Sequence, residues 1–277
     1  MNKVKLSFSP CPNDTFIFDA MVHHKIDTEG IIFEYTMADV EELNQAAFNN
    51  EPDICKVSYH AYLYLIDKYV LLHSGSALGM DVGPLFISKN NVNKEDFNRL
   101  KVAIPGKYTT AHLLLSIVFP EIVNKTEVLF SDIEDKVISN EFDAGVIIHE
   151  NRFTYHERGL KLISDLGKEW YKLTKQAIPL GGIVVKRDLP DSLKQSINRV
   201  LKRSVEYAFA NPDSGKEFIR CNAQEMSEEV MYKHIDLYVN EYTLDLGIKG
   251  KNAVTTLFEM AVEKNMIPQF PQKSLFL

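Results

Sequence analysis

The stretch VKLSFSPCPNDTF, from Val4 to Phe16, decides the fold class of this chain. Its first half alternates apolar Val4, Leu6 and Phe8 with polar residues, which is the period of a half-buried strand. Two prolines then end the strand, and an apolar helical stretch runs from Phe16 to Val22. A strand, a tight loop and a helix in this order are the opening unit of an α/β fold.

The same alternation of strands and helices continues through residues 31–148. Alternating strands and helices predict parallel strand pairing with helices on the sheet faces, because parallel neighbours need a crossover connection. The expected strands are residues 31–35, 53–57, 84–88, 101–104, 127–130, 144–148 and 183–185, and the expected helices are residues 40–49, 59–68, 94–100, 110–119 and 133–140. Residues 192–266 are expected to be mostly helical.

The pattern starts again after Gly79, which predicts a second α/β unit. With no low-complexity linker between the units, we expect two lobes joined by short crossing strands. Residues 1–88 together with 186–277 are expected to form the first lobe, and residues 89–185 the second. A cleft between the lobes is the expected place for a ligand.

Composition excludes several classes of protein. The 277 residues are 45% hydrophobic and 25% charged, as in ordinary globular proteins. No apolar run reaches the roughly 18 residues of a membrane helix, and the first residues lack the apolar run of a signal peptide, so we expect a cytoplasmic protein with no membrane partner. A net charge of −7 disfavours nucleic acid as a partner, so an anionic ligand must be held locally.

Cysteine usage points away from disulfides and thiolate metal sites. Cys11, Cys55 and Cys221 are far apart in the sequence and form no C-x-x-C pair. We expect three reduced thiols.

The loop between the first strand and helix is one candidate for ligand binding. Loops that follow a strand and precede a helix carry the ligands of open parallel sheets. Asn13, Asp14 and Thr15 offer hydrogen-bonding groups there. The alternative is that these residues only cap the helix and form the turn.

A second candidate is the segment Ile104–His112, which again contains a strand end, a glycine turn and a helix start. Backbone N–H groups and the helix dipole can receive a carboxylate near Thr109, Thr110 and Ala111. The segment is not a P-loop, because it lacks the spaced glycine and the adjacent Lys-Ser/Thr. A capped helix with nothing bound is the alternative.

Two further segments end at strand termini. The apolar strand that starts at Gly145 leads to His149, whose imidazole suits proton abstraction near neutral pH; a hydrogen-bonded structural histidine is the alternative. Lys56, Val57 and Ser58 end the third expected strand, with helix capping by Ser58 as the alternative. No metal site is expected, because Phe153 stands where H-E-x-x-H needs its second histidine.

Together these segments resemble the 1,4-dihydroxy-6-naphthoate synthase family of the futalosine route to menaquinone (vitamin K2). The resemblance rests on SPCPNDTF from Ser9, KVS from Lys56, AIPGKYTTA from Ala103 and GVIIHE from Gly145. It implies a two-lobed α/β fold like that of type II periplasmic binding proteins, with the ligand in the cleft between the lobes. It also implies that His149 is the proton acceptor, and that residues 56–58 and 109–111 contact the substrate.

The activity implied by the resemblance is that of a carbon–carbon lyase that needs no cofactor. Such an enzyme converts cyclic dehypoxanthinylfutalosine to 1,4-dihydroxy-6-naphthoate and releases dihydroxyacetone, so its partner is a small anionic metabolite. Two alternatives stay open at this point. One is chorismate dehydratase of the same pathway, and the other is a non-catalytic protein that binds a small anion. The sequence does not predict the oligomeric state.

Overall fold

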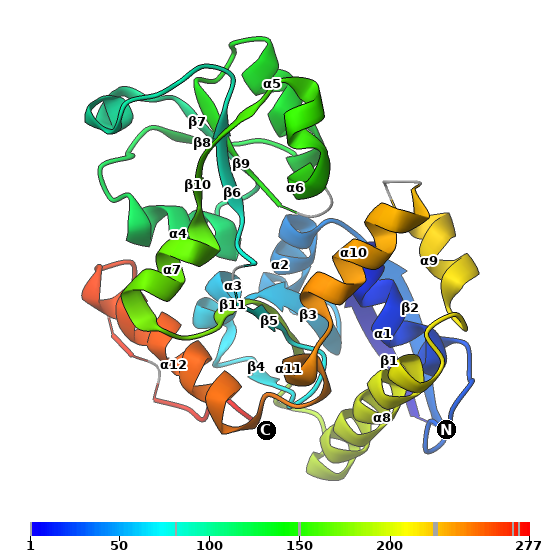
Figure 1. Ribbon diagram of the computed structural model, residues 1–277. Helices are drawn as coiled ribbons and strands as arrows, with labels where there is room; N and C mark the ends of the chain where they lie inside the picture. Colours follow the sequence, from blue (N-terminus) through cyan, green and yellow to red (C-terminus); the bar gives the residue numbers. More distant parts are fainter. Residues whose placement is uncertain (1, 81, 149–150, 224–226, 268, 271) are drawn as a thin grey trace.

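The computed structural model describes residues 2–80, 82–148, 151–223, 227–267, 269–270 and 272–277. Two β-sheets lie one above the other in Figure 1, each in its own lobe. The first sheet has the order β2-β1-β3-β11-β4, with β5 beside β11; the second has the order β10-β6-β9-β7-β8. The strands of the first sheet are β1 (Asn2–Phe8), β2 (Ile31–Met37), β3 (Ile54–Ser58), β4 (Tyr69–Leu71), β5 (Ala77–Gly79) and β11 (Ile178–Lys186). The strands of the second sheet are β6 (Leu85–Ser88), β7 (Val102–Ile104), β8 (Lys125–Glu127), β9 (Ala144–Ile147) and β10 (Lys161–Asp165).

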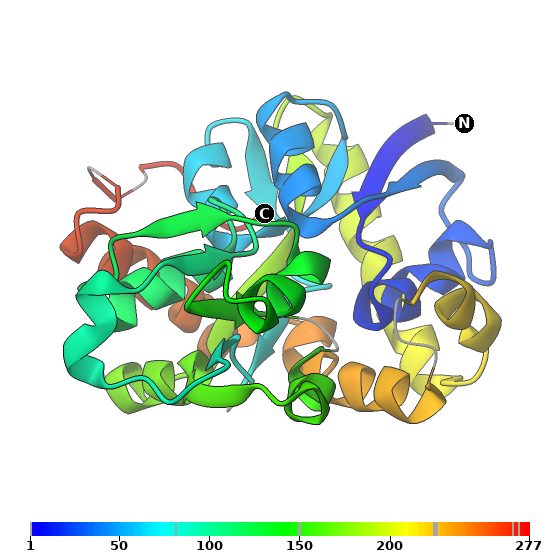
Figure 2. The same cartoon turned by 90° about the horizontal axis from the view of Figure 1, so that it is seen from above.

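Helices cover both sheets and form most of the C-terminal third. The α-helices are α1 (Pro12–Val22), α2 (Val40–Phe48), α3 (Tyr59–Leu65), α4 (Thr110–Val118), α5 (Ile133–Ile138), α6 (Asn151–Thr154), α7 (Leu166–Thr174), α8 (Asp191–Ala210), α9 (Lys216–Asn222), α10 (Glu228–Tyr238), α11 (Glu241–Leu244) and α12 (Gly247–Glu263). Seen from above in Figure 2, α8 and α9 gather beside α1 at one end of the molecule. The C-terminal third therefore completes the first lobe.

The opening strand and helix form as the sequence predicts. The apolar positions of β1 are buried, and β1 pairs in parallel with β2 and β3. Pro12 occupies the first turn of α1, where its missing N–H costs no helical hydrogen bond, so the helix starts earlier than the expected Phe16. The rings of Phe8 and Phe18 stack with centroids 4.5 Å apart, which fixes α1 against the sheet.

Both sheets are mixed, so the expectation of parallel pairing is only partly right. β1, β2 and β3 are parallel to one another, as are β7, β8 and β9. β11 runs antiparallel to β3, and β6 runs antiparallel to β9. These two strands lie next to the connections between the lobes, so their direction is set by the crossing of the chain and not by a helical crossover within one sheet.

Several expected elements differ in type or position. Residues 94–99 form a 3₁₀ helix in place of the expected α-helix. The expected strand at 127–130 lies earlier, as β8, and a 3₁₀ turn covers Phe130–Asp132. Sequence patterns did not predict β4, β5, β10 or α7. Of these, β4 and β5 have three residues each, which is too short for a readable alternation.

The chain crosses between the lobes at two places, and the sheets shift the expected lobe limits. β6 belongs to the second sheet although residues up to 88 were assigned to the first lobe, and β11 belongs to the first sheet although residues up to 185 were assigned to the second. By sheet membership, β6 belongs with the second lobe and β11 with the first. The remaining limits of the two lobes stay a prediction. The first crossing touches the start of α7, where a Cβ on Gly83 would lie 1.9 Å from the backbone nitrogen of Gly167. Only glycine fits this contact.

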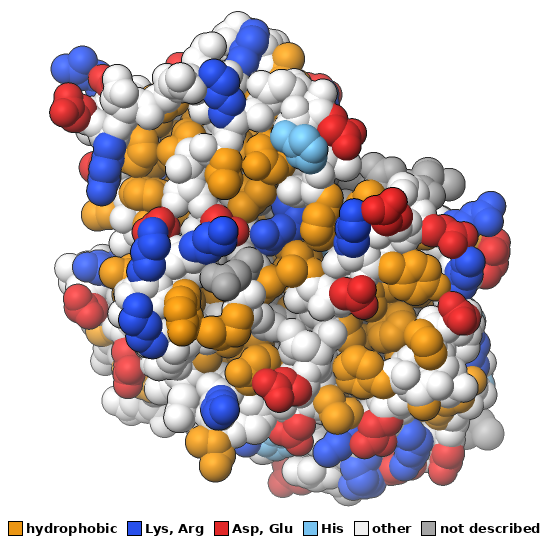
Figure 3. Space-filling view, viewed as in Figure 1, with side chains coloured by type: hydrophobic (Ala, Val, Ile, Leu, Met, Phe, Trp, Pro, Cys, Tyr) orange, Lys and Arg blue, Asp and Glu red, His pale blue; other side chains and the backbone are white. Residues whose placement is uncertain are grey.

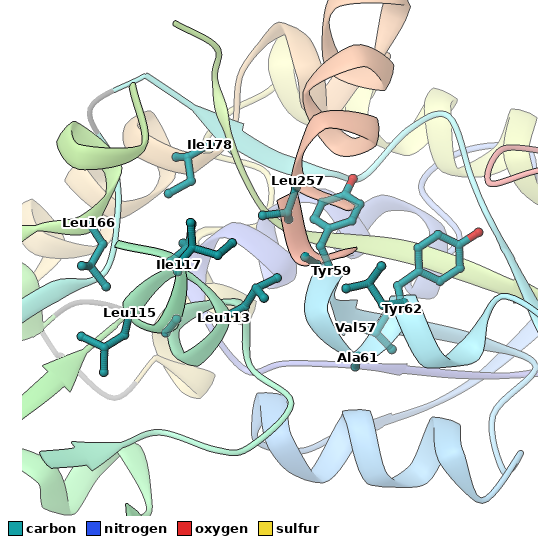
Figure 4. Close-up of a cluster of buried hydrophobic side chains, with 14 of the residues drawn as sticks. Val57, Tyr59, Ala61, Tyr62, Leu113, Leu115, Ile117, Leu166, Ile178 and Leu257 are labelled. Atoms are coloured by element: carbon teal, nitrogen blue, oxygen red, sulfur yellow. The ribbon is translucent and has the colours of Figure 1, made fainter. Parts of the chain in front are cut away.

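One hydrophobic core continues from lobe to lobe behind the crossings. Figure 4 shows Leu113 and Ile117 of α4 beside Tyr59 of α3, with Leu257 of α12 close by. Ile178, at the start of β11, belongs to the same cluster. This shared core holds the start of α4 and the end of β3 at the same side of the molecule, which is where the functional candidates lie.

The surface agrees with the mixed composition. Figure 3 shows acidic and basic side chains interspersed over one face, among the residues that the structure describes. In the described part of the chain, the helices are too short or too polar to cross a bilayer.

Candidate active site

A pocket lies between the two lobes and collects most of the residues that the sequence singled out. Its lining includes Asn13 and Asp14 from α1, Lys56, Val57 and Ser58 from the end of β3, and Thr109, Thr110 and Ala111 from the start of α4. The first lobe thus supplies two of these segments and the second lobe supplies one. Three segments that the sequence analysis chose separately therefore meet in one pocket.

The charged centre of the pocket is a buried ion pair between Lys56 and Asp14. Lys56 Nζ lies 2.6 Å from Asp14 Oδ1, and the side chains are 8% and 1% exposed. Asp14 Oδ2 also accepts hydrogen bonds from the hydroxyl and the backbone N–H of Ser9, at 2.7 and 3.2 Å. Such additional donors compensate for the loss of water around a buried carboxylate. The pair fixes the first loop to the end of β3.

Gly181 makes room for the lysine of this pair. Gly181 faces Ser58 across the β3–β11 ladder, and a Cβ there would lie 3.0 Å from the carbonyl oxygen of Val57 and 3.1 Å from Cε of Lys56. Both contacts are tighter than van der Waals distance. The glycine therefore allows the Lys56 side chain to lie flat against β11 on its way to Asp14.

Ser58 occupies the N-cap position of α3, as the alternative allowed, but its side chain does not cap the helix. The Ser58 side chain makes no capping hydrogen bond to α3. Instead, Asn44 of α2 donates to Ser58 Oγ at 3.3 Å and accepts from the backbone N–H of Ser58 at 2.9 Å. This paired contact holds the end of β3 in place beneath the pocket.

The hydroxyl groups of the two threonines at the start of α4 make hydrogen bonds within the protein. Thr109 Oγ1 accepts from the N–H of His112 at 3.3 Å as the helix cap, and donates to the carbonyl of Gly106 at 2.8 Å. Thr110 Oγ1 donates to the carbonyl of Leu180 on β11 at 2.6 Å, which ties α4 to the first sheet. Contact of Thr109 and Thr110 with a substrate stays a prediction. The N–H groups of Thr110 and Ala111 have no intrahelical acceptor and remain the donors at this end.

Thr15 lies outside the pocket lining. It is fully buried, and its hydroxyl donates to the carbonyl of Cys11 at 3.1 Å. Thr15 therefore stabilises the first turn of α1, which is the capping and turn alternative considered for this loop. Asn13 and Asp14, by contrast, both reach the pocket.

The expected base, His149, lies outside the described residues. β9 ends at Ile147, and Ile148, the next residue, lines the pocket. The residue that precedes His149 in the sequence therefore lies at the pocket. The role of His149 stays a prediction.

Sequence reasoning missed the wall of the pocket that α10 provides. His234 and Tyr238 line the pocket, and their rings lie 4.6 Å apart. His234 is 1% exposed, and its Nε2 lies 2.8 Å from Asn13 Oδ1. The only signal in the sequence was the spacing of four residues, which places both rings on one helix face. A buried histidine and tyrosine at this spacing are common in ordinary helix cores.

Two further histidines support the start of α4 from outside the pocket lining. His60 Nδ1 donates to the carbonyl of Thr109 at 3.2 Å, and His112 Nδ1 is 2.7 Å from the carbonyl of Lys107. Burial, with the neighbouring His112 as a second cause, lowers the pKa of His60 to about 4. Burial also lowers the pKa of His112. His60 is therefore neutral at pH 7 and acts as a hydrogen-bond donor.

Among the described residues, no group of three or more His, Cys, Asp or Glu side chains is arranged to hold a metal ion. Cys11 and Cys55 are buried and Cys221 is exposed.

Comparison with known proteins places the chain in a family. A family model described as "Menaquinone biosynthesis" matches residues 4–263. The chain is 41% identical over 272 residues to the "1,4-dihydroxy-6-naphtoate synthase" of Thermus thermophilus, covering 98% of both chains. It is 36% identical over 270 residues to the protein of the same name from Streptomyces coelicolor, covering 96% of this chain and 95% of the relative.

Solved structures agree with the two-lobed architecture. A protein of Archaeoglobus fulgidus superposes with a TM-score of 0.90 at 34% identity, covering 96% of this chain and 98% of that one. The ligand-binding component of an ABC-type import system from Staphylococcus aureus has a TM-score of 0.73 at 11% identity, covering 96% and 93%. At that identity the likeness shows the fold alone. The expected α/β fold of the periplasmic-binding-protein type is confirmed.

Proposed function

This chain belongs to the menaquinone biosynthesis family as an enzyme of the naphthoate synthase type, and on that premise we propose its reaction. The enzyme converts cyclic dehypoxanthinylfutalosine to 1,4-dihydroxy-6-naphthoate and releases dihydroxyacetone. The observation that carries the proposal is the near full-length identity of 41% and 36% to two named synthases. The pocket adds support, because it lies between the lobes and is walled by the segments that carry the resemblance.

The proposed reaction requires the protein to bind the substrate and to supply one base. Loss of a substrate proton starts the carbon–carbon cleavage, and the atoms of the substrate are divided between the two products. The formation of an aromatic naphthalene favours the products, so the reaction needs no oxidant or reductant. Holding the substrate in one orientation between the lobes supplies a large part of the rate enhancement.

In this proposal, different walls of the pocket bind different parts of the substrate. The N–H groups at the start of α4 face an anionic group of the substrate, since the helix dipole favours negative charge there. Lys56 is already paired with Asp14, so it presents a neutralised pair to the ligand and not a free cation. Asn13 and Ser58 provide polar contacts on the opposite wall.

In this proposal the base is His149. In the sequence it follows Ile148, which lines the pocket and comes directly after β9. A neutral imidazole is suited to proton abstraction near neutral pH, and general-base catalysis contributes about 10²- to 10⁴-fold. We expect His149→Ala to lower kcat at least ~100-fold while binding of 1,4-dihydroxy-6-naphthoate is retained. An unchanged kcat would remove His149 from the mechanism.

Parallel incubations with two substrates test the proposed reaction against its alternatives. We expect the purified protein to consume cyclic dehypoxanthinylfutalosine, to form the naphthoate and dihydroxyacetone in equal amounts, and to leave chorismate untouched. Turnover of chorismate alone would identify a chorismate dehydratase. Tight binding of the product without turnover of either substrate would identify a binding protein with this fold.

A further inference from the structure

The wall that α10 adds to the pocket carries an inference about His234. This histidine is nearly fully buried, lines the pocket, and contacts Asn13 across 221 positions of sequence. Asn13 in turn contacts Asp14, which pairs with Lys56. Four polar side chains from α1, β3 and α10 therefore form one continuous chain along the pocket.

The direction of each hydrogen bond in this chain follows from its charged end. The Asp14 carboxylate accepts from Lys56 Nζ and from the Ser9 hydroxyl. Asn13 Nδ2 lies 2.9 Å from Asp14 Oδ1, and only the amide nitrogen of Asn13 has hydrogens to donate there. The amide oxygen of Asn13 must then face the other way, towards His234.

The orientation of the amide defines the tautomer of His234. An amide oxygen only accepts, so Nε2 of His234, 2.8 Å from it, carries a hydrogen. A neutral His234 is therefore the Nε2–H tautomer. The buried carboxylate thus determines, through Asn13, which ring nitrogen of a residue on α10 is protonated.

We propose that His234 is a positioning residue, which holds the Asn13 amide in one orientation at the pocket wall. Asn13 lines the pocket, so the orientation of its amide decides whether a ligand meets an N–H donor or a carbonyl oxygen there. With Nδ2 held towards Asp14 and Oδ1 towards His234, the wall presents a fixed pattern of polar groups to an oxygen-rich anionic ligand. This inference rests on the proposed function, because that reaction supplies the ligand whose orientation is at stake.

The position of Tyr238 supports the same reading. Tyr238 lies one helical turn after His234, its ring is 4.6 Å from the imidazole, and it also lines the pocket. The tyrosine ring restricts the rotation of the imidazole. The face of α10 that touches the pocket is therefore arranged around the hydrogen bond to Asn13.

Nitrogen NMR of the wild-type protein tests the tautomer directly. With histidine labelled by ¹⁵N, the signals of His234 are assigned from the spectrum of His234→Gln, in which they are missing. We expect the Nε2–H tautomer at pH 7.5. The Nδ1–H tautomer would overturn the inference, and this outcome does not depend on catalysis.

Kinetics of two variants test the positioning role. His234→Phe keeps a ring but removes the donor, which leaves the Asn13 oxygen without its partner on α10; we expect kcat/KM to fall ~10-fold or more and the product to bind more weakly. His234→Gln keeps an N–H donor near the Nε2 position, so we expect it to stay within ~3-fold of wild type. His73→Phe is the matched control, a partly buried histidine of the same lobe that does not line the pocket.

The two variants also separate positioning from simple packing. Equal losses in His234→Phe and His234→Gln would indicate that only the shape of the ring matters and would overturn the proposal, as would full activity of His234→Phe. If the wild-type protein does not turn over cyclic dehypoxanthinylfutalosine, the proposed function fails instead, while the tautomer measurement still decides the inference.

Discussion

At the scale of single residues, the Lys56–Asp14 pair is the feature that organises the pocket. The sequence predicted both residues as site candidates, because each lies where a strand gives way to a helix. Their pairing across 42 positions was not predictable, because each residue alone has the sequence context of a solvent-exposed charged side chain. His234 was not predictable for a similar reason, because its partner Asn13 lies 221 positions away.

Removing one member of this pair is expected to destabilise the protein strongly. Lys56→Met leaves the Asp14 carboxylate buried without its cation, and breaking a buried pair in this way costs about 3–5 kcal/mol. Urea unfolding measures the loss. The double variant Lys56→Met/Asp14→Asn is expected to recover part of it, because no uncompensated charge remains.

Lys3→Met is the matched control for this prediction. Lys3 pairs with Glu34 at 2.7 Å, but both side chains are well exposed. Exposed pairs contribute little to stability, so the unfolding midpoint of Lys3→Met is expected to equal that of wild type. Equal midpoints for Lys3→Met and Lys56→Met would contradict the importance assigned to burial.

At the scale of elements, sequence patterns predicted those strands and helices that show a clear hydrophobic period. β1, β2, α2 and α4 are examples, each with its apolar face on a core. The pattern did not give strand direction, so the antiparallel course of β6 and β11 was missed. Nor did it show that the hydroxyls of Thr109 and Thr110 are used within the protein, because a capping threonine and a ligand-binding threonine have the same sequence context.

The junction between α3 and α4 is expected to make stability depend on pH. His60 has a folded-state pKa of about 4, lowered by burial, against about 6.5 in the unfolded chain. Below pH 6.5 the unfolded chain takes up a proton that the folded protein does not, so stability is full above this pH and falls as the pH drops towards 4. From pH 7.5 to 5.0 the expected loss is about 2 kcal/mol.

The variant His60→Asn isolates this contribution. Asparagine can donate to the Thr109 carbonyl in place of Nδ1, but it does not titrate. Urea unfolding at the two pH values is expected to show a smaller loss in the variant than in wild type. The same pH dependence in both proteins would exclude His60 as the cause.

At the scale of the whole molecule, the sequence predicted two lobes and a cleft between them. It did so because the alternation of strands and helices starts twice without a flexible linker between the two units. The exact place of the first crossing was not predictable, since it depends on a backbone contact between Gly83 and Gly167 of α7, which are distant in sequence. Both glycines lie beside the pocket wall formed by Pro84.

This contact predicts a strong effect of a single methyl group. In Gly83→Ala the new Cβ would meet the backbone nitrogen of Gly167 at 1.9 Å, so the first crossing or the start of α7 must shift. Overpacking of this kind costs at least ~2 kcal/mol, and the moved pocket wall is expected to raise KM for the substrate. Activity and urea unfolding measure both effects.

Gly30→Ala serves as the control for the crossing. Gly30 has a positive φ of 73°, but a Cβ there would meet nothing within 4 Å. We expect a cost of about 1 kcal/mol from the backbone alone and an unchanged KM. A larger change of KM in Gly30→Ala than in Gly83→Ala would contradict the role given to the crossing.

The central claim is that the reaction takes place in the pocket between the lobes, at the start of α4 and beside the Lys56–Asp14 pair. A crystal structure with bound 1,4-dihydroxy-6-naphthoate tests this claim most directly. We predict that the product lies between the two sheets, with its carboxylate at the N–H groups of Thr110 and Ala111 and a hydroxyl group within hydrogen-bond reach of His149. Product bound elsewhere, with this pocket closed to it, would contradict the account.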